Sequence, residues 1–376
     1  MTSSVPFVDL SVQHAPIQAE LEVVLLAAVR QGQFILGEAL AQLETDFALA
    51  SGAQYGVGVG TGTDAIALGL QACGIGKGDE VLVPANTFIA TVMGVLQAGA
   101  QPRLVDCCLD TALIDLDAAA QAITPRTKAI VPVHLYGQMV SPRDLQAFAQ
   151  AHDLLILEDS AQAHLAQREG YIAGSVGRAA AYSFYPSKNL GAFGDGGMLL
   201  TSEEAIAGRV RCYRNYGAAQ KYIHTERGRN SRLDNLQAAI LNVKLPHLKT
   251  WNQQRNAAAQ QYDEALAKMS DRGIVPLKNE SGLGHVYHLY VIRVSEPAPL
   301  GRDQLRAALG DRGIQTGIHY PIPCHLQPAY KFLDYEAGDF PQAERLCQEI
   351  LSLPMFPGLS TAQIETVVEA IQSLQQ

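Results

Sequence analysis

The sequence lacks a long apolar run, and its first residues lack the pattern of a secretory signal. No stretch approaches the ~20 apolar residues that cross a bilayer. Residues 1–6 carry no positive charge ahead of an apolar segment. We therefore expect no contact with a membrane and no secretion, and we expect the protein to be cytoplasmic.

Basic clusters and paired cysteine motifs are also missing. The 28 basic and 37 acidic residues give a net charge of −9, which argues against nucleic acid as a partner. No C-x-x-C motif and no zinc-ligand spacing occurs, so we expect no metal site and no disulfides. The cysteines are expected to be small core residues in a reducing compartment. They are Cys73, Cys107, Cys108, Cys212, Cys324 and Cys347.

The residues that are present indicate a soluble globular protein of two domains. The length is 376 residues, with 48% apolar and 17% charged residues. Up to about residue 245, short apolar runs alternate with helical patterns, which predicts an α/β domain with a mainly parallel sheet covered on both faces. The expected strands are 55–60, 80–84, 102–105, 129–134 and 154–158, and the expected helices are 38–50, 64–73, 90–99, 116–123 and 142–153.

The pattern changes near residue 246. A long helical segment is followed by fewer strands, which predicts a smaller α+β domain. We place the boundary near Trp251, with a large domain at 1–250 and a small domain at 251–376. The expected helices are 246–269, 303–309, 342–352 and 361–373, and the expected strands are 285–294 and 315–320.

One lysine stands directly after an apolar strand. Residues 179–185 have the composition of a buried strand, and Lys188 follows in a glycine-rich segment. Open α/β sheets bind ligands at the carboxyl ends of their strands. A partly desolvated amine there loses its proton more easily, so it can attack a carbonyl and form a Schiff base. Lys188 is therefore the predicted catalytic residue.

Other segments supply what an aldehyde cofactor such as pyridoxal phosphate needs around that lysine. Residues 59–65 follow a strand and open a helix, so their N–H groups and threonine hydroxyls suit a phosphate, with a further hydroxyl from Ser183. Asp159 ends a strand and can pair with a pyridine nitrogen, while Gln162 lies one turn further on. Phe88 ends another strand and can stack on a ring. Residues 317–325 have the polar aromatics and prolines of a substrate loop.

Alternative interpretations exist for each of these features taken singly. Lys188 alone fits a surface residue, and Asp159 alone fits a helix cap. The spacing Gly60-x-Gly62-x-x-Ala65 also matches a dinucleotide turn, which would indicate an NAD(P)-dependent oxidoreductase. A fold that only senses a cofactor or sugar is a further alternative. The joint occurrence of a phosphate-type turn, a strand-end acid and a strand-end lysine favours the pyridoxal phosphate interpretation.

Five segments resemble the DegT/DnrJ/EryC1 family of pyridoxal-phosphate sugar aminotransferases. They are VGTGTDAIALGL (59–70), GDEVLVPANTFIAT (78–91), ILEDSAQAH (156–164), SFYPSKNLGAFGDGGML (183–199) and RNYG…GRNSRLDNLQAAIL (214–241). The resemblance implies the aspartate aminotransferase fold (fold type I), with a three-layer αβα large domain and a smaller C-terminal α+β domain. It also implies transfer of the amino group of L-glutamate to a keto group on a nucleotide-linked deoxyhexose.

The resemblance assigns roles residue by residue. Lys188 matches the Schiff-base lysine, Asp159 the acid at the pyridine nitrogen, and Gln162 the partner of the ring hydroxyl. Phe88 matches the stacking ring. The phosphate contacts match Gly62, Thr63 and Ser183, together with Asn230, which reaches the phosphate of the neighbouring subunit. This last assignment implies an obligate homodimer with shared active sites.

The resemblance also bears on the substrate. The residues around Lys188, including Tyr185, resemble enzymes that aminate C3 of dTDP-linked 3-keto-6-deoxyhexoses or UDP-linked relatives. A 4-keto sugar aminotransferase is the alternative within the family. Further expected substrate contacts are His319 and Tyr320, with Lys221 and Tyr222 near the sugar diphosphate. Arg229 departs from the family pattern, and the sequence leaves its role open.

Overall fold

Seven strands form the main sheet of the computed structural model, which describes residues 4–375. The strands are β1 (Tyr55–Val59), β2 (Glu80–Pro84), β3 (Gln101–Val105), β4 (Thr127–Ile130), β5 (Leu155–Asp159), β8 (Ala179–Ser183) and β9 (Gly197–Thr201). Their order is β1-β9-β8-β5-β4-β2-β3. The pairs from β8 to β3 are parallel, and β9 runs against both of its neighbours. The expected mainly parallel sheet is confirmed.

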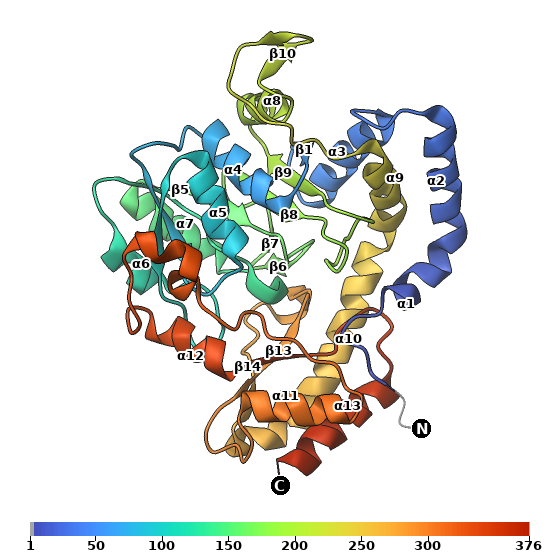
Figure 1. Ribbon diagram of the computed structural model, residues 1–376, viewed down its shortest axis with the longest axis vertical. Helices are drawn as coiled ribbons and strands as arrows, with labels where there is room; N and C mark the ends of the chain where they lie inside the picture. Colours follow the sequence, from blue (N-terminus) through green and yellow to red (C-terminus); the bar gives the residue numbers. More distant parts are fainter. Residues whose placement is uncertain (1–3, 376) are drawn as a thin grey trace.

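Helices cover both faces of this sheet (Figure 1). They are α3 (Glu38–Ala50), α4 (Gly62–Ala72), α5 (Ile89–Ala98), α6 (Leu116–Ala122), α7 (Pro142–His152), α8 (Glu204–Tyr213) and α9 (Asn235–Lys244). Successive side chains of a strand point to opposite faces. Accordingly, Ala181 packs in the core that contains Ile66 of α4, whereas Tyr182 packs in the core that contains Leu40 of α3 and Leu241 of α9. The large part of the protein therefore has the predicted three-layer αβα architecture.

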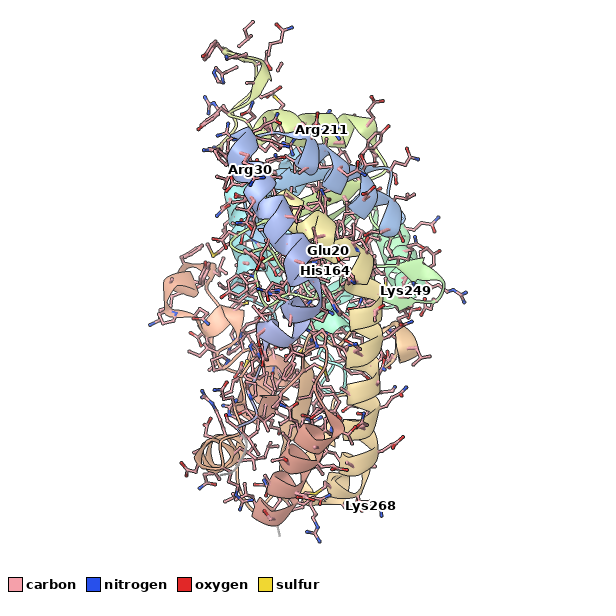
Figure 2. All side chains as sticks on the ribbon, turned by 90° about the vertical axis from the view of Figure 1, so that its right-hand side faces the viewer. Glu20, Arg30, His164, Arg211, Lys249 and Lys268 are labelled. Atoms are coloured by element: carbon pink, nitrogen blue, oxygen red, sulfur yellow. The ribbon has the colours of Figure 1, made fainter. Side chains whose placement is uncertain are left out.

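The C-terminal part is built on a long helix and a small antiparallel sheet. Seen from the side, α10 (Leu248–Leu266) descends from Lys249 toward Lys268 and joins the upper and lower parts of the molecule (Figure 2). The sheet has the order β12-β13-β14, with all neighbours antiparallel. The remaining elements are β12 (Ile274–Pro276), β13 (Tyr290–Val294), α11 (Arg302–Asp311), α12 (Pro341–Glu349), β14 (Ile350–Leu353) and α13 (Thr361–Leu374).

The N-terminal end of the described range packs against this C-terminal part. Val5 is buried in its core and forms a parallel bridge with Ile314. The chain then passes through α1 (Leu10–His14) and α2 (Gln18–Gln31), and α2 packs along α9. The division expected at residue 250 falls just inside α10, and it stays a prediction.

Four expected elements differ from the structure. The strand expected at 129–134 ends at Ile130 as β4. Residues 315–320 form a loop with one bridge, from Gly317 to Ser352, because hydrogen bonds from Tyr136 and Gln162 hold residues 319 and 320. The segment 285–294 becomes a strand only at Tyr290. The helix expected at 342–352 ends at Glu349, because the apolar residues that follow pair with β13 as β14.

A small hairpin of β10 (Ala218–Gln220) and β11 (Ile223–His224) projects from the body of the protein at the top of Figure 1. Another two-stranded pair is β6 (Gln167–Arg168) with β7 (Tyr171–Ile172). Neither hairpin was expected from the sequence. Short strands with few apolar residues give little periodic signal.

Residues 4–375 can be searched for the disulfides, the metal site and the membrane-spanning helix that the sequence was expected to lack. All six cysteines are free, and three of them are buried, but Cys108 is exposed, so its expected place in the core is wrong. Within these residues no three His, Cys, Asp or Glu side chains gather where they could share a metal ion. No helix in this range has both the length and the apolar character that a bilayer crossing requires.

Candidate active site

A cavity of about 420 Å³ opens where β5 and β8 end. Carboxyl ends of parallel strands meet at one edge of a sheet, which is why residues far apart in sequence converge there. Most of the predicted site residues line it. They are Gly62, Thr63, Phe88, Asp159, Gln162, Ser183, Tyr185, Lys188, His319 and Tyr320.

Lys188 stands in the tight turn that follows β8. Its backbone N–H donates to the carbonyl of Tyr185 at 2.8 Å, and its side chain is partly buried in the cavity wall. Burial lowers the pKa of the Lys188 amine to about 8, although the carboxylate of Asp159 works in the opposite direction. A substantial fraction of this amine is therefore neutral, and hence nucleophilic, near neutral pH.

Asp159 faces the same cavity from the end of the neighbouring strand β5. Its Oδ2 accepts from Thr91 Oγ1 at 2.8 Å, and its Oδ1 accepts from the N–H of Ala161 at 3.1 Å. Burial raises the pKa of the Asp159 carboxyl above its usual value, while these hydrogen bonds and Lys188 oppose the rise. A cationic N–H in the cavity would stabilise the ionised carboxylate.

The turn between β1 and α4 forms the third wall of the cavity. Thr61 caps α4, and its Oγ1 accepts from the N–H of Asp64 at 3.1 Å. In the part of the chain that the structure describes, the N–H groups of Gly62 and Thr63 have no hydrogen-bond acceptor. A Cβ atom on Gly62 would lie 2.8 Å from Cβ of Ser183, so only glycine allows this close approach. The turn can therefore bind an anion through free N–H groups and hydroxyls.

Two neighbouring aromatic rings also line the cavity. Phe88 is 51% exposed, and the centroid of its ring lies 5.2 Å from that of Tyr320, with an angle of 33° between the ring planes. Gln162 Nε2 donates to the hydroxyl of Tyr320 at 3.2 Å, while its Oε1 accepts from the N–H of Tyr136 at 2.7 Å. The hydroxyl of Tyr136 donates to the carbonyl of His319. These contacts hold the loop around residues 319 and 320 against the main sheet.

Two histidines give the cavity neutral polar groups. Nδ1 of His319 lies 2.9 Å from Ser352 Oγ, and the His319 ring stacks on the ring of Phe7. Burial lowers the pKa of His319 to about 4, so this ring is neutral at neutral pH. Burial also holds the pKa of His288 well below its usual value, and His288 Nδ1 has no partner among residues 4–375. His288 lines the cavity as well.

Sequence reasoning missed three contributors, Thr91, Tyr136 and His288. Thr87 and Thr91 are one helical turn apart after a strand, and that spacing was the available signal for Thr91. His288 stands among apolar residues just before β13, where a polar side chain needs a reason. Tyr136 has a positive φ of 60°, which the sequence does not reveal.

Three predicted residues lie outside this cavity. Asn230 is exposed and pairs through its backbone with Asn215. Lys221 and Tyr222 are at the tip of the β10–β11 hairpin, where the ring of Tyr222 is 83% exposed. Their expected roles involve a second copy of the chain, and they stay predictions.

The cavity thus offers a lysine amine, a buried carboxylate and an anion-binding turn on three sides. These groups match the aldehyde, the ring nitrogen and the phosphate of pyridoxal phosphate, so the residues present fit this cofactor. Fold and site together define the class of fold type I enzymes that use it. The sequence profile of the DegT/DnrJ/EryC1/StrS aminotransferase family matches residues 16–372, and the chain belongs to that family.

Relatives extend over nearly the whole chain. A pleiotropic regulatory protein of Geobacillus stearothermophilus is 45% identical over 368 residues, or 98% of each chain. A UDP-N-acetyl-3-dehydro-alpha-D-glucosamine 3-aminotransferase of Acidithiobacillus ferrooxidans is 42% identical, covering 98% of each chain. A dTDP-3-amino-3,4,6-trideoxy-alpha-D-glucose transaminase of Streptomyces venezuelae is 41% identical, covering 99% of this chain and 96% of the relative.

Solved structures agree with this assignment. DesV of S. venezuelae, in complex with a ketimine intermediate, superposes with a TM-score of 0.95 at 41% identity and covers 100% of this chain and 99% of its own. NtdA of Bacillus subtilis, with bound cofactor PMP, gives a TM-score of 0.90 at 32% identity, with 100% and 86% covered. The expected fold, the expected aminotransferase class and its pyridoxal phosphate cofactor are confirmed. The alternative of a dinucleotide oxidoreductase no longer applies.

Proposed function

We propose that this protein transfers the amino group of L-glutamate to the 3-keto group of a nucleotide-linked deoxyhexose. One observation carries the proposal: the amine of Lys188, with a pKa lowered to about 8, faces the buried carboxylate of Asp159 across one cavity. In this proposal Lys188 holds pyridoxal phosphate as a Schiff base. Aminotransfer on nucleotide sugars is the activity named for its relatives.

The cavity residues divide the work of holding the cofactor. Asp159 in its ionised form keeps a proton on the ring nitrogen, and the cofactor then supplies an electron-withdrawing ring. Phe88 offers a face for that ring. Gly62 and Thr63 donate N–H groups to the phosphate from the first turn of α4.

Lys188 also moves protons. The amino group of glutamate would first displace Lys188 from the cofactor. The freed Nζ would then take a proton from Cα of glutamate, and in the second half-reaction it would deliver a proton to C3 of the sugar. A general acid–base works best when its pKa lies near the operating pH, and an amine with a pKa of about 8 meets this condition where an ordinary lysine does not.

The sugar is expected to bind beneath the loop that carries His319 and Tyr320. His319 is held by Ser352, and Tyr320 by Gln162, so both side chains are fixed before a substrate arrives. Tyr185 is 55% exposed at the mouth of the cavity. The preference for C3 is supported by two relatives whose names specify position 3, one on a dTDP sugar and one on a UDP sugar.

A homodimer with shared active sites is part of the proposal. Asn230, Lys221 and Tyr222 do not reach the cavity of their own chain, and the hairpin that carries two of them projects away from it. Ile223 on that hairpin is 54% exposed, although it is a large apolar residue. A second subunit would cover these residues and bring Asn230 to the phosphate of its partner.

The test is a positional assay. The purified enzyme is supplied with ¹⁵N-labelled glutamate and with 3-keto and 4-keto sugars linked to dTDP or UDP, and NMR locates the label. We expect label at C3, and none with Lys188→Ala. Label at C4 would contradict the predicted position, and activity with a different amino donor would contradict glutamate. No turnover on any keto sugar would favour a sensing role instead.

A further inference from the structure

The side chain of Arg229 pairs with Asp64 in the first turn of α4 instead of extending freely into solvent. Its Nη1 donates to Asp64 Oδ1 at 3.2 Å and to Gln97 Oε1 at 2.8 Å. The Arg229 and Asp64 side chains are 31% and 21% exposed, so water screens the ion pair only in part. The sequence had left this arginine without a role.

Asp64 links Arg229 to the turn that follows β1. Its second oxygen, Oδ2, accepts from Ser231 Oγ at 2.8 Å and from Thr61 Oγ1 at 3.3 Å. The N–H of Gly60 donates to Ser231 Oγ at 3.0 Å. One carboxylate therefore ties the segment 229–231 to the turn 60–63, and both of its oxygens are engaged.

We propose that Arg229 is a positioning residue for the phosphate of the cofactor and that it acts through Asp64. The proposal rests on the proposed function, in which Gly62 and Thr63 bind that phosphate. Arg229 touches none of the reacting atoms. Its contribution is to hold the carboxylate that orders the turn and to compensate its charge.

The charge argument follows from the place of Asp64 in the first turn of α4. A negative charge there stabilises the helix, because it faces the positive end of the helix dipole. A phosphate bound to the same turn brings further negative charge nearby, and the two repel. The guanidinium of Arg229 offsets this repulsion while the hydrogen bonds of Asp64 are retained.

The same contacts orient Asn230. Arg229 and Ser231 both bind Asp64, whereas Asn230 lies between them in an extended segment that bridges Asn215. Alternate side chains of an extended chain point to opposite sides. Asn230 is consequently exposed, in the orientation that reaching a second subunit would require.

The experiment compares pyridoxal phosphate with pyridoxal, which lacks the phosphate. The full chain is freed of cofactor and titrated with each compound by absorbance. For Arg229→Gln we expect Kd for pyridoxal phosphate to rise about three- to fivefold, the loss expected for a partly exposed ion pair, with no change for pyridoxal. The difference should shrink in 1 M salt, which screens the charges.

Two further variants make the result specific. Adding Asp64→Asn to Arg229→Gln removes the uncompensated charge, so affinity for pyridoxal phosphate should return to within about twofold of wild type. Arg178→Gln is the matched control, because Arg178 forms an exposed ion pair with Glu203 away from the cavity, and both Kd values should stay unchanged.

The proposal is overturned if Arg229→Gln weakens both ligands equally, or if it weakens neither. Failure of the second substitution to restore affinity overturns the role of charge compensation. A wild-type protein that binds neither ligand would refute the proposed function itself. If the wild type prefers pyridoxal phosphate to pyridoxal and Arg229→Gln keeps the same preference, only the role of Arg229 is refuted.

Discussion

Replacing Thr91 by valine removes the hydroxyl that donates to Asp159, the proposed partner of the cofactor ring. The shape of the side chain is preserved. Thr91 is completely buried, and its Oγ1 donates to Asp159 Oδ2 at 2.8 Å. It also lies 2.9 Å from Thr87 Oγ1. Valine fills about the same volume, so we expect the variant to fold. The main effect should be on the pKa of Asp159.

The magnitude follows from the strength of that hydrogen bond. A hydrogen bond to a charged group contributes about 1.5–3 kcal/mol, and one pKa unit corresponds to about 1.4 kcal/mol. Removing that bond should therefore raise the pKa of Asp159, already raised by burial, still further, by the equivalent of about 1.5–3 kcal/mol. In the proposed function, activity requires the ionised carboxylate, so activity is lost as the pH falls through this pKa. The acid side of the pH–rate profile should move to higher pH.

The assay is the pH dependence of kcat for wild type, Thr91→Val and Thr91→Ser. A bound pyridinium lowers the pKa of Asp159 in all three enzymes, so the comparison between them is preserved. The serine variant retains a hydroxyl, and its profile should follow that of wild type. An unchanged acid side in Thr91→Val, with the folded structure intact, would refute the idea that this hydrogen bond sets the charge of Asp159.

Three more substitutions test other parts of the structure. Gly62→Ala places a Cβ 2.8 Å from Ser183 Cβ, so the Kd of pyridoxal phosphate should rise at least about tenfold in an absorbance titration. Tyr136→Phe removes the hydrogen bond to the His319 carbonyl, so steady-state kinetics should show a higher KM for the sugar. Burial lowers the pKa of Lys244 to about 8. Between pH 8 and pH 10 this amine is largely neutral in the folded protein and protonated in the unfolded protein. The free energy of unfolding of the wild type, measured with urea, should therefore increase by about 2–3 kcal/mol from pH 7 to pH 10, and that of Lys244→Met should lack this increase.

The phosphate turn, Asp159 and Lys188 were predictable because each lies at the end of a strand or shortly after it. In a parallel sheet, strand ends share one edge, so order along the chain translates into proximity. The structure adds that β5 and β8 are neighbours, with Asp159 beside Ala181 in the register. Local sequence was sufficient to place these residues at one edge of the sheet, because strand direction decides which edge a strand end reaches.

The substrate loop was not predictable in the same way. His319 and Tyr320 were expected in a strand, but Tyr136 and Gln162 hold them in a loop from positions more than 150 residues away. Likewise, residues 350–353 are apolar enough for a helix end or a strand, and pairing with β13 decides between them. Tertiary contacts override local patterns at both places.

The position of Lys188 itself depends on such contacts as well. The next residue, Asn189, donates to Asn252 of α10 and to the carbonyl of Val286, both at 2.8 Å. The buried ammonium of Lys244 in α9 donates to the carbonyl of Gly191. Two helices therefore fix the segment after the lysine, and one of them continues into the C-terminal part. A shift of α10 would consequently reach Lys188, because the neighbouring residue Asn189 is bonded to α10 through Asn252.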